Sequence, residues 1–186
     1  IDRASKTSVA NFGFFIGATS GNLRSLNDAQ PACGIKIFMG SSTGDLLVDD
    51  EKHLDQIFGN GSRLIAVHAE DETRIQDRTK SLLDGNENPD YSIHSIIRDP
   101  QTALIATERA LSLSKKYERR LHVLHLSTAE EVKRLRHDKP DWVSCEVIPN
   151  HLFLNTDDYQ TLGSRVQMNP PIRDPENTPE LWAGLH

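Results

Sequence analysis

The sequence predicts an α/β fold built on a parallel β-sheet. Short apolar runs alternate with helical patterns, lysine and histidine stand in or at the ends of several runs, and no Gly-x-Gly-x-x-Gly turn opens a helix. The alternation indicates strands joined by helical crossovers, whereas the absent glycine motif argues against dinucleotide binding. Five such units fit either a doubly wound sheet or part of an eight-stranded barrel.

Five apolar runs are expected to form the strands. Clusters of glycine, proline and polar residues bound most of them, which is typical of buried strands in α/β proteins. The predicted strands are Val9–Ile16, Ile35–Met39, Arg63–Val67, Leu121–Leu126 and Trp142–Ile148.

Helical patterns fill the intervals between these strands. Pro100–Tyr117 is the clearest helix, because a proline opens it, apolar residues recur at helical spacing, and lysines stand near its end. Ser127 is expected to cap a helix that runs to Arg136. Residues 150–177 are predicted to be mostly loop. The remaining predicted helices are residues 22–29, 49–58, 72–83 and a last helix that starts near Pro179.

Bulk composition excludes some classes of function. The net charge of -6 argues against a nucleic-acid surface, which needs a basic face. No apolar run is long enough to cross a membrane, and no signal-peptide pattern is present. Cys33 and Cys145 lie in strand-like contexts and are predicted to be buried free thiols, which suits a reducing compartment such as the cytoplasm.

Chemically active side chains stand where the predicted strands end. Lys36 lies within the second strand, and His68 and His125 lie at the ends of the third and fourth. Functional residues of parallel barrels gather at the carboxyl ends of strands. Neutral imidazole binds zinc, and a neutral buried lysine can react with carbon dioxide to give an anionic carbamate that bridges two metal ions. These three residues therefore indicate a metal site at one rim.

Each of these residues also has a structural interpretation. Lys36 could pair with a carboxylate or extend to the surface, and His68 and His125 could be ordinary buried histidines. His122 lies close before His125, and spacing alone does not choose between them. The other histidines in helical or loop contexts, predicted to be solvated, are His53, His94 and His137.

Three further charged residues are expected to support the fold or the site. Arg98 precedes a predicted helix, where a structural ion pair is the preferred interpretation. Glu70 and Asp71 follow His68, and we expect them to contact ligand residues or to start a helix rather than to bind metal themselves.

Five motifs together give the chain a family resemblance. It resembles the cyclic amidohydrolases, and most of all the dihydroorotases of type I. The motifs follow the family's order along nearly the whole chain, and jointly they are highly specific. They are residues 34–39 (GIKIFM), 67–70 (VHAE), 125–127 (HLS), 145–154 (CEVIPNHLFL) and 168–173 (MNPPIR).

The resemblance implies roles for individual residues. Lys36 matches the carboxylated lysine that bridges two zinc ions, and His68 and His125 match the histidines that bind the second metal. Asn169 matches the asparagine that contacts the substrate ring in dihydroorotases, which favours them over hydantoinases. Asn150 stands where a His-His pair is common, so His151 is expected only to support the ligands.

The resemblance also implies an incomplete barrel. Relatives carry a His-x-His pair on the first strand and a proton-shuttling aspartate after the eighth, and neither motif is found here. Residues 1–186 are therefore expected to form a single incomplete amidohydrolase barrel domain, a partial TIM (β/α)8 barrel with about strands 3–7. The catalytic aspartate is expected to lie beyond His186.

The implied activity is reversible hydrolysis of dihydroorotate to N-carbamoyl-aspartate, a step of pyrimidine biosynthesis in the cytoplasm. A small-molecule substrate, a homo-oligomer and possible contact with a transcarbamoylase follow from the resemblance. The isolated piece is expected to be inactive. Two alternatives stay open: a hydantoinase, dihydropyrimidinase or allantoinase, and a non-catalytic scaffold that keeps the barrel for assembly.

Overall fold

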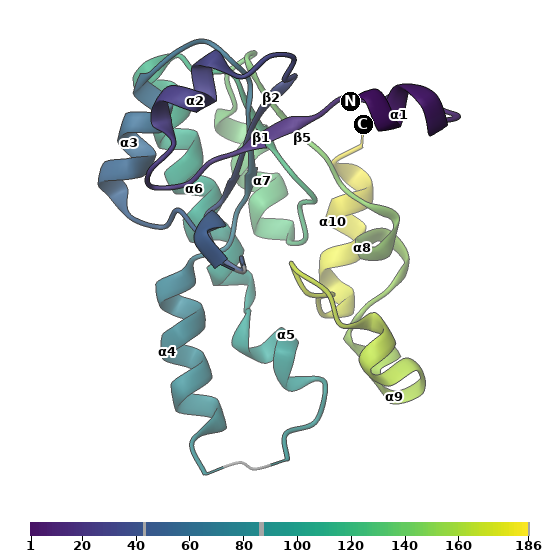
Figure 1. The fold of residues 1–186 in the computed structure, drawn as a ribbon. Coiled ribbons are helices and arrows are strands. Elements are labelled where there is room, and N and C mark those ends of the chain that lie inside the picture. The colour runs from purple at the N-terminus through teal and green to yellow at the C-terminus, as the bar shows by residue number, and fades with distance from the viewer. Residues whose placement is uncertain (43, 86–87, 186) are drawn as a thin grey trace.

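The computed structural model describes residues 1–42, 44–85 and 88–185, and its centre is a five-stranded parallel sheet (Figure 1). Each strand pairs with the next one along the chain, in the order β1-β2-β3-β4-β5. The strands are β1 (Phe15–Gly17), β2 (Gly34–Phe38), β3 (Ile65–His68), β4 (Leu121–Val123) and β5 (Val143–Cys145). This sequential parallel order is that of a partial (β/α)8 barrel, as the sequence predicted.

Helices connect successive strands and continue after β5. The described helices are α1 (Asp2–Thr7), α2 (Leu23–Asp28), α3 (Glu51–Gly59), α4 (Glu72–Leu83), α5 (Ile93–Ile97), α6 (Pro100–Tyr117), α7 (Ala129–Asp138), α8 (Pro149–Phe153), α9 (Tyr159–Leu162) and α10 (Thr178–Ala183). Short 3-10 turns span Gly44–Leu46, Thr156–Asp158, Gly163–Val166 and Pro175–Asn177.

The two faces of the sheet differ in chemistry because successive side chains of a strand alternate between them. In β2, Ile35 and Ile37 are fully buried and belong to the main apolar core together with residues of α3, α6 and α7. Lys36 and Phe38 point to the opposite face and are half-buried. That second face therefore carries the chemistry, while the first holds the fold together.

A second, smaller core stabilises the region after β5. Tyr159, Val166 and Ile172 are buried in it, and Met168 packs against it. The predicted loop of residues 150–177 is thus a set of short helices and turns folded around its own apolar cluster.

Three further expectations about local structure are wrong. Residues 9–14 are not a strand, since only Phe15–Gly17 pairs with β2. The cap of α7 is Thr128 rather than Ser127, because the Thr128 hydroxyl accepts from the backbone of Glu131 and the Glu131 carboxylate accepts from that of Thr128.

The cysteines give the third correction. Cys33 and Cys145 are free, as predicted, but exposed rather than buried. Cys33 precedes β2, and Cys145 lies on β5, an outer strand of the sheet, so their neighbours cover them incompletely. No helix among the described residues is both long and apolar enough to cross a membrane.

Candidate metal and substrate site

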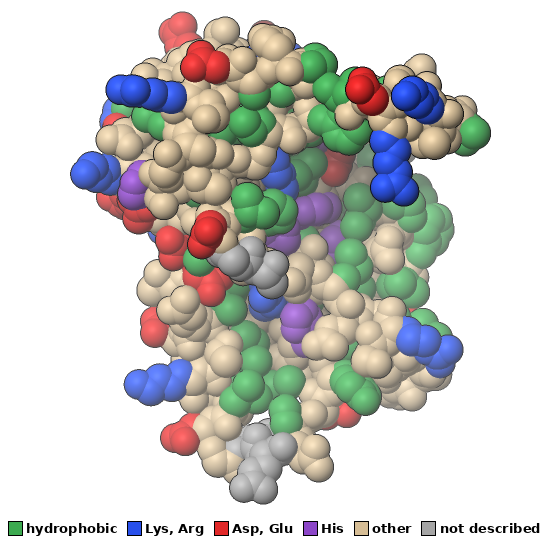
Figure 2. Space-filling model, in the orientation of Figure 1, with side chains coloured by type: hydrophobic (Ala, Val, Ile, Leu, Met, Phe, Trp, Pro, Cys, Tyr) green, Lys and Arg blue, Asp and Glu red, His purple; other side chains and the backbone are tan. Residues whose placement is uncertain are grey.

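The site lies where β2, β3 and β4 end, on the polar face of the sheet. In the register of the sheet, Phe38 is opposite His68 and Lys36 is opposite Ala66, so Lys36 and His68 share a face. Figure 2 shows histidine side chains gathered in the hollow in the middle of the molecule. The structure thus brings the predicted residues to one rim.

His68 and His125 meet directly. The Nδ1 atom of His68 lies 3.2 Å from the Nε2 atom of His125, and their rings stand edge to face. Zinc–nitrogen bonds of about 2.0–2.1 Å at a tetrahedral angle separate two nitrogens by about 3.3 Å. The separation of these two nitrogens therefore fits two ligands of one metal ion.

The backbone at His125 is unusual in a way that fits a functional site. Its φ of 40° lies in the left-handed region, which a residue with a side chain adopts only at a cost of about 1–3 kcal/mol. The chain turns there directly after β4 and directs the imidazole toward His68. Burial lowers the pKa of His125 to about 3, and the charges of His68 and Lys36 act in the same direction. The imidazole is therefore neutral at pH 7, as a metal ligand must be.

Glu70 sets the tautomer of His68. One oxygen of this fully buried carboxylate, Oε2, lies 2.7 Å from His68 Nε2, and it also accepts from the Ser41 hydroxyl at 2.7 Å and from the Arg98 guanidinium at 2.8 Å. A carboxylate only accepts, so His68 carries its proton on Nε2 and leaves Nδ1 free to bind a cation. Arg98 forms the predicted ion pair, and Glu70 contacts His68, one of the predicted ligands.

The loops that carry these groups approach each other closely at Gly40. A Cβ atom at this position would lie 2.5 Å from the backbone oxygen of Glu70. Only glycine fits there, which allows Ser41 to reach the Glu70 carboxylate.

Lys36 has the electrostatic character expected for a lysine that reacts with carbon dioxide. Burial lowers its pKa to about 8, against the opposing charge of Glu146, so an appreciable fraction of the amine is neutral near physiological pH. Its Nζ atom lies 4.5 Å from the centre of the Phe38 ring. His122, the alternative to His125, instead contacts Ser144 at 2.8 Å and Glu146 at 3.2 Å.

Two imidazoles alone do not complete a metal site. Among the described residues, no group of three or more His, Cys, Asp or Glu side chains is placed to hold an ion. The two imidazoles therefore need a further ligand, and a carbamate on Lys36 would be one of the right charge. Three buried polar atoms of these residues have no hydrogen-bond partner in the described parts of the chain: His125 Nδ1, Glu70 Oε1 and His151 Nδ1. The residues present thus fit a metal centre completed by Lys36.

Asn169 and His151 lie in the region after β5. Asn169 is exposed, and its side-chain oxygen lies 2.9 Å from His94 Nε2. His151 is buried in α8, its Nε2 donates to the Pro170 carbonyl at 3.1 Å, and burial lowers its pKa to about 4. His151 thus braces the loop that carries Asn169.

Sequence relatives carry the name of the family expected from the motifs. The chain is 35% identical to a dihydroorotase of Methanosarcina mazei over 100% of its own length and 43% of the relative, and equally identical to that of Methanosarcina acetivorans over 98% and 41%. The chain is a homologue of the dihydroorotases. It spans less than half the length of these relatives. No family model matches it.

Solved structures place this homologue in the amidohydrolase superfamily. An L-hydantoinase of Arthrobacter aurescens superposes with a TM-score of 0.86 and 29% identity, over 93% of this chain and 40% of the other. The predicted partial barrel and the predicted family are both confirmed.

Sequence reasoning missed one contact of Asn169. His94 was expected to be solvated, but it is half-buried and contacts both Met168 and Asn169. The available signal was the short interval between His94 and Arg98, which lie in α5 and at its C-terminal cap.

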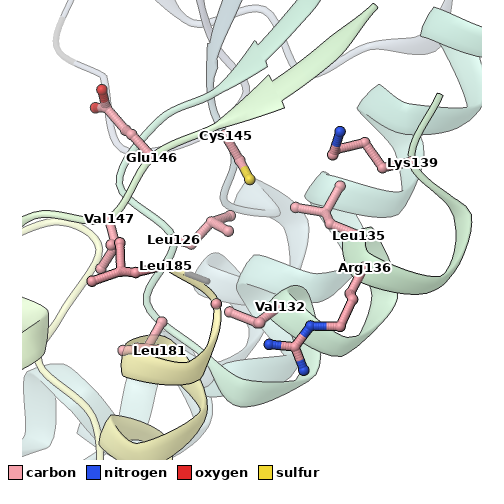
Figure 3. Close-up of a pocket in the computed structure, with 11 residues that line it drawn as sticks. Leu126, Val132, Leu135, Arg136, Lys139, Cys145, Glu146, Val147, Leu181 and Leu185 are labelled. Carbon is pink, nitrogen blue, oxygen red and sulfur yellow. The ribbon is translucent and has the colours of Figure 1, made fainter. Parts of the chain in front are cut away.

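An apolar pocket of about 410 Å³ lies elsewhere, between β5, α7 and α10 (Figure 3). Leucine and valine side chains line it, Cys145 points into it, and Arg136 and Lys139 stand at its margin. None of the predicted site residues lines this pocket, so it is separate from the rim that holds His68 and His125.

Proposed function

We propose that the protein is a metal-dependent cyclic amidohydrolase that interconverts dihydroorotate and N-carbamoyl-aspartate. The observation that carries the proposal is the pair of imidazole nitrogens 3.2 Å apart at the strand ends of a chain homologous to dihydroorotases. Pyrimidine biosynthesis is the setting that this reaction implies.

The residues of the chain divide the work between holding metal and holding substrate. Lys36, as its carbamate, together with His68 and His125 would hold zinc, and two ions per site are proposed. Bound divalent ions supply Lewis-acid polarisation of the amide carbonyl. Glu70 fixes His68 in the binding tautomer, Asn169 orients the ring, and His151 braces the loop of Asn169. No residue of this chain is assigned the proton transfer.

A substrate panel tests the proposal in the full-length protein. We expect zinc-dependent turnover of dihydroorotate in both directions, and Lys36→Ala should reduce kcat/KM by at least about 10³-fold through the loss of a metal ligand. Carbamate on Lys36 is detected independently by ¹³C NMR after exposure to labelled bicarbonate. The matched control is Lys139→Ala, a lysine at the margin of the separate pocket. Zinc-loaded wild-type protein that leaves dihydroorotate unchanged would refute the assignment.

Hydantoin hydrolysis is the second candidate, because the L-hydantoinase structure matches this fold closely. The sequence relatives at 35% identity and Asn169 favour dihydroorotate. Turnover of hydantoin, dihydrouracil or allantoin in place of dihydroorotate would reverse this order.

We further propose that residues 1–186 form one incomplete barrel domain that lacks the first, second and eighth strands. Two observations support this: β1 and β5 have unpaired outer edges within the described residues, and the chain covers 43% of the relative. Association with a second copy or a transcarbamoylase would cover such edges. The two free thiols support a reducing compartment, and we propose the cytoplasm.

A further inference from the structure

His94 contacts the loop of residues 168–173 through one ring nitrogen. Its Nε2 atom lies 2.9 Å from the backbone oxygen of Met168 and 2.9 Å from the side-chain oxygen of Asn169. These partners lie 74 and 75 residues away along the chain, so the contact is made by the tertiary fold.

The chemistry of the partners determines which atom donates. A backbone carbonyl only accepts, so His94 must carry a proton on Nε2 to bond with Met168. The same proton then faces the Asn169 side chain, which must turn its carbonyl oxygen toward it. The orientation of the Asn169 amide is therefore set by the hydrogen-bond network.

With its oxygen engaged, Asn169 presents its NH₂ group. The residue is exposed, and no other residue in the described parts of the chain forms a hydrogen bond with Nδ2. An NH₂ group donates only, so its complement on a bound molecule is an acceptor oxygen.

Additional bonds hold α5 and the loop of residues 168–173 together. The Ser95 hydroxyl donates to the backbone oxygen of Ile172 at 3.0 Å, and the buried Arg173 guanidinium donates to the backbone oxygen of Arg98. Ile172 is itself fully buried in the smaller core. These contacts hold the loop that carries Asn169 in place, and the contact with His94 determines the orientation of the Asn169 amide.

We propose that His94 is a positioning residue that makes Asn169 a hydrogen-bond donor for an acceptor oxygen of the substrate. This inference rests on the proposed function and assigns a substrate feature to it. The oxygen belongs either to a carboxylate or to a ring carbonyl, since both accept from an amide.

Three variants of the full-length protein test the donor. His94→Gln places an amide nitrogen near the former Nε2 atom and retains a donor, whereas His94→Phe keeps the ring shape and removes it. We expect His94→Phe to raise KM about tenfold with kcat within about twofold, and His94→Gln to stay near wild type. His137→Phe, at an exposed histidine of α7, is the control and should change neither constant.

Paired ligands identify the oxygen. Dihydrouracil is dihydroorotate without its carboxylate, and it is used here as a competitive inhibitor of dihydroorotate turnover. An effect of His94→Phe confined to the KM of dihydroorotate assigns the carboxylate, and an equal effect on the inhibition constant of dihydrouracil assigns a ring carbonyl. Equal impairment of the Gln and Phe variants would overturn the proposal, because ring volume rather than the donor would then matter. Wild-type constants for both variants would overturn it as well.

A measurement without turnover separates this inference from the proposed function. Long-range ¹H–¹⁵N NMR should show His94 with its proton on Nε2, and the Asn169 side-chain amide resonances should move in His94→Phe and not in His137→Phe. A proton on Nδ1 alone would contradict the contact. Absence of cyclic amide turnover by wild-type protein would instead refute only the proposed function.

Discussion

At the scale of single residues, Glu70 shows how the site is organised. Burial alone would raise the pKa of this carboxyl, yet the hydrogen bond from His68 and the charge of Arg98 bring it down to about 2. The group is ionised at neutral pH although its side chain is fully buried. A buried charge persists only when its partners compensate for its lost hydration, so His68, Arg98 and Ser41 form one unit with Glu70.

Replacement of Glu70 by glutamine should disrupt that unit. The variant removes the charge that compensates half-buried Arg98 and places an amide beside His68, where its NH₂ group opposes the Nε2 proton. We expect a loss of about 3 kcal/mol in unfolding free energy, measured by urea denaturation, and zinc affinity lower by about 10–100-fold. Glu108→Gln, in a half-exposed pair with Arg134, should cost less than about 1 kcal/mol. Equal losses in the two variants would rule out the proposed unit.

The sequence predicts some of these residues and not others, for a physical reason. Lys36, His68 and His125 were found because parallel strands bring their carboxyl ends to one rim, a rule that needs no tertiary detail. The contact of His94 with Asn169 depends on the placement of α5, a five-residue helix that meets a loop about 75 residues further along the chain. No local pattern encodes that placement.

At the scale of elements, prediction succeeded where local signals were strong. The helices Glu72–Leu83 and Pro100–Tyr117 have the predicted bounds, since each begins after an aspartate whose side chain accepts from the first turn. The run Val9–Ile16 failed as a strand because strand formation requires a partner, and only its end reaches β2. The short helix α9 depends on the smaller core, and α8 depends on the main core through Leu152. Neither helix has a strong sequence signal of its own.

Asp99, which caps the start of α6, gives a prediction about how fold stability depends on pH. Burial would raise the pKa of Asp99, but hydrogen bonds from Arg74 and Thr102 lower it to about 2. The pKa of Asp99 is lower in the folded state than its unfolded value of 3.8, so the ionised carboxylate stabilises the fold when the pH is above 3.8. That stability is lost as the pH falls toward 2. Asp99→Asn keeps a helix-capping side chain and removes the charge, so it isolates this contribution.

We expect Asp99→Asn to lower the unfolding free energy by about 1 kcal/mol at pH 6, less than the full pKa shift would give because solvent reaches the ion pair. The difference from wild type should vanish as the pH approaches 2. Asp55→Asn, at the exposed partner of Lys116, is the control and should show no measurable difference. A difference for Asp99→Asn that persists at pH 2 would indicate that the capping geometry, rather than charge, was lost.

At the scale of the molecule, the sheet is open. Within the described residues, β1 and β5 each pair on one side only. Aromatic side chains are exposed beside β1, where Phe12, Phe14 and Phe15 are each 45–46% accessible. An unpaired edge next to exposed apolar surface is a template for association with another chain.

The 186-residue chain should therefore self-associate when it is produced alone, and it should show no turnover of dihydroorotate. Sedimentation over a wide range of protein concentration measures the association. Phe14→Lys places a charge beside β1 and should shift the equilibrium toward monomer, because an edge lysine opposes strand pairing. Val9→Lys changes a fully exposed residue outside the sheet and should leave the equilibrium as it is. A wild-type chain that stays monomeric at every concentration would show that the unpaired edges of its sheet do not drive association. Dihydroorotate turnover by that monomer would mean that strands β1–β5 suffice for catalysis.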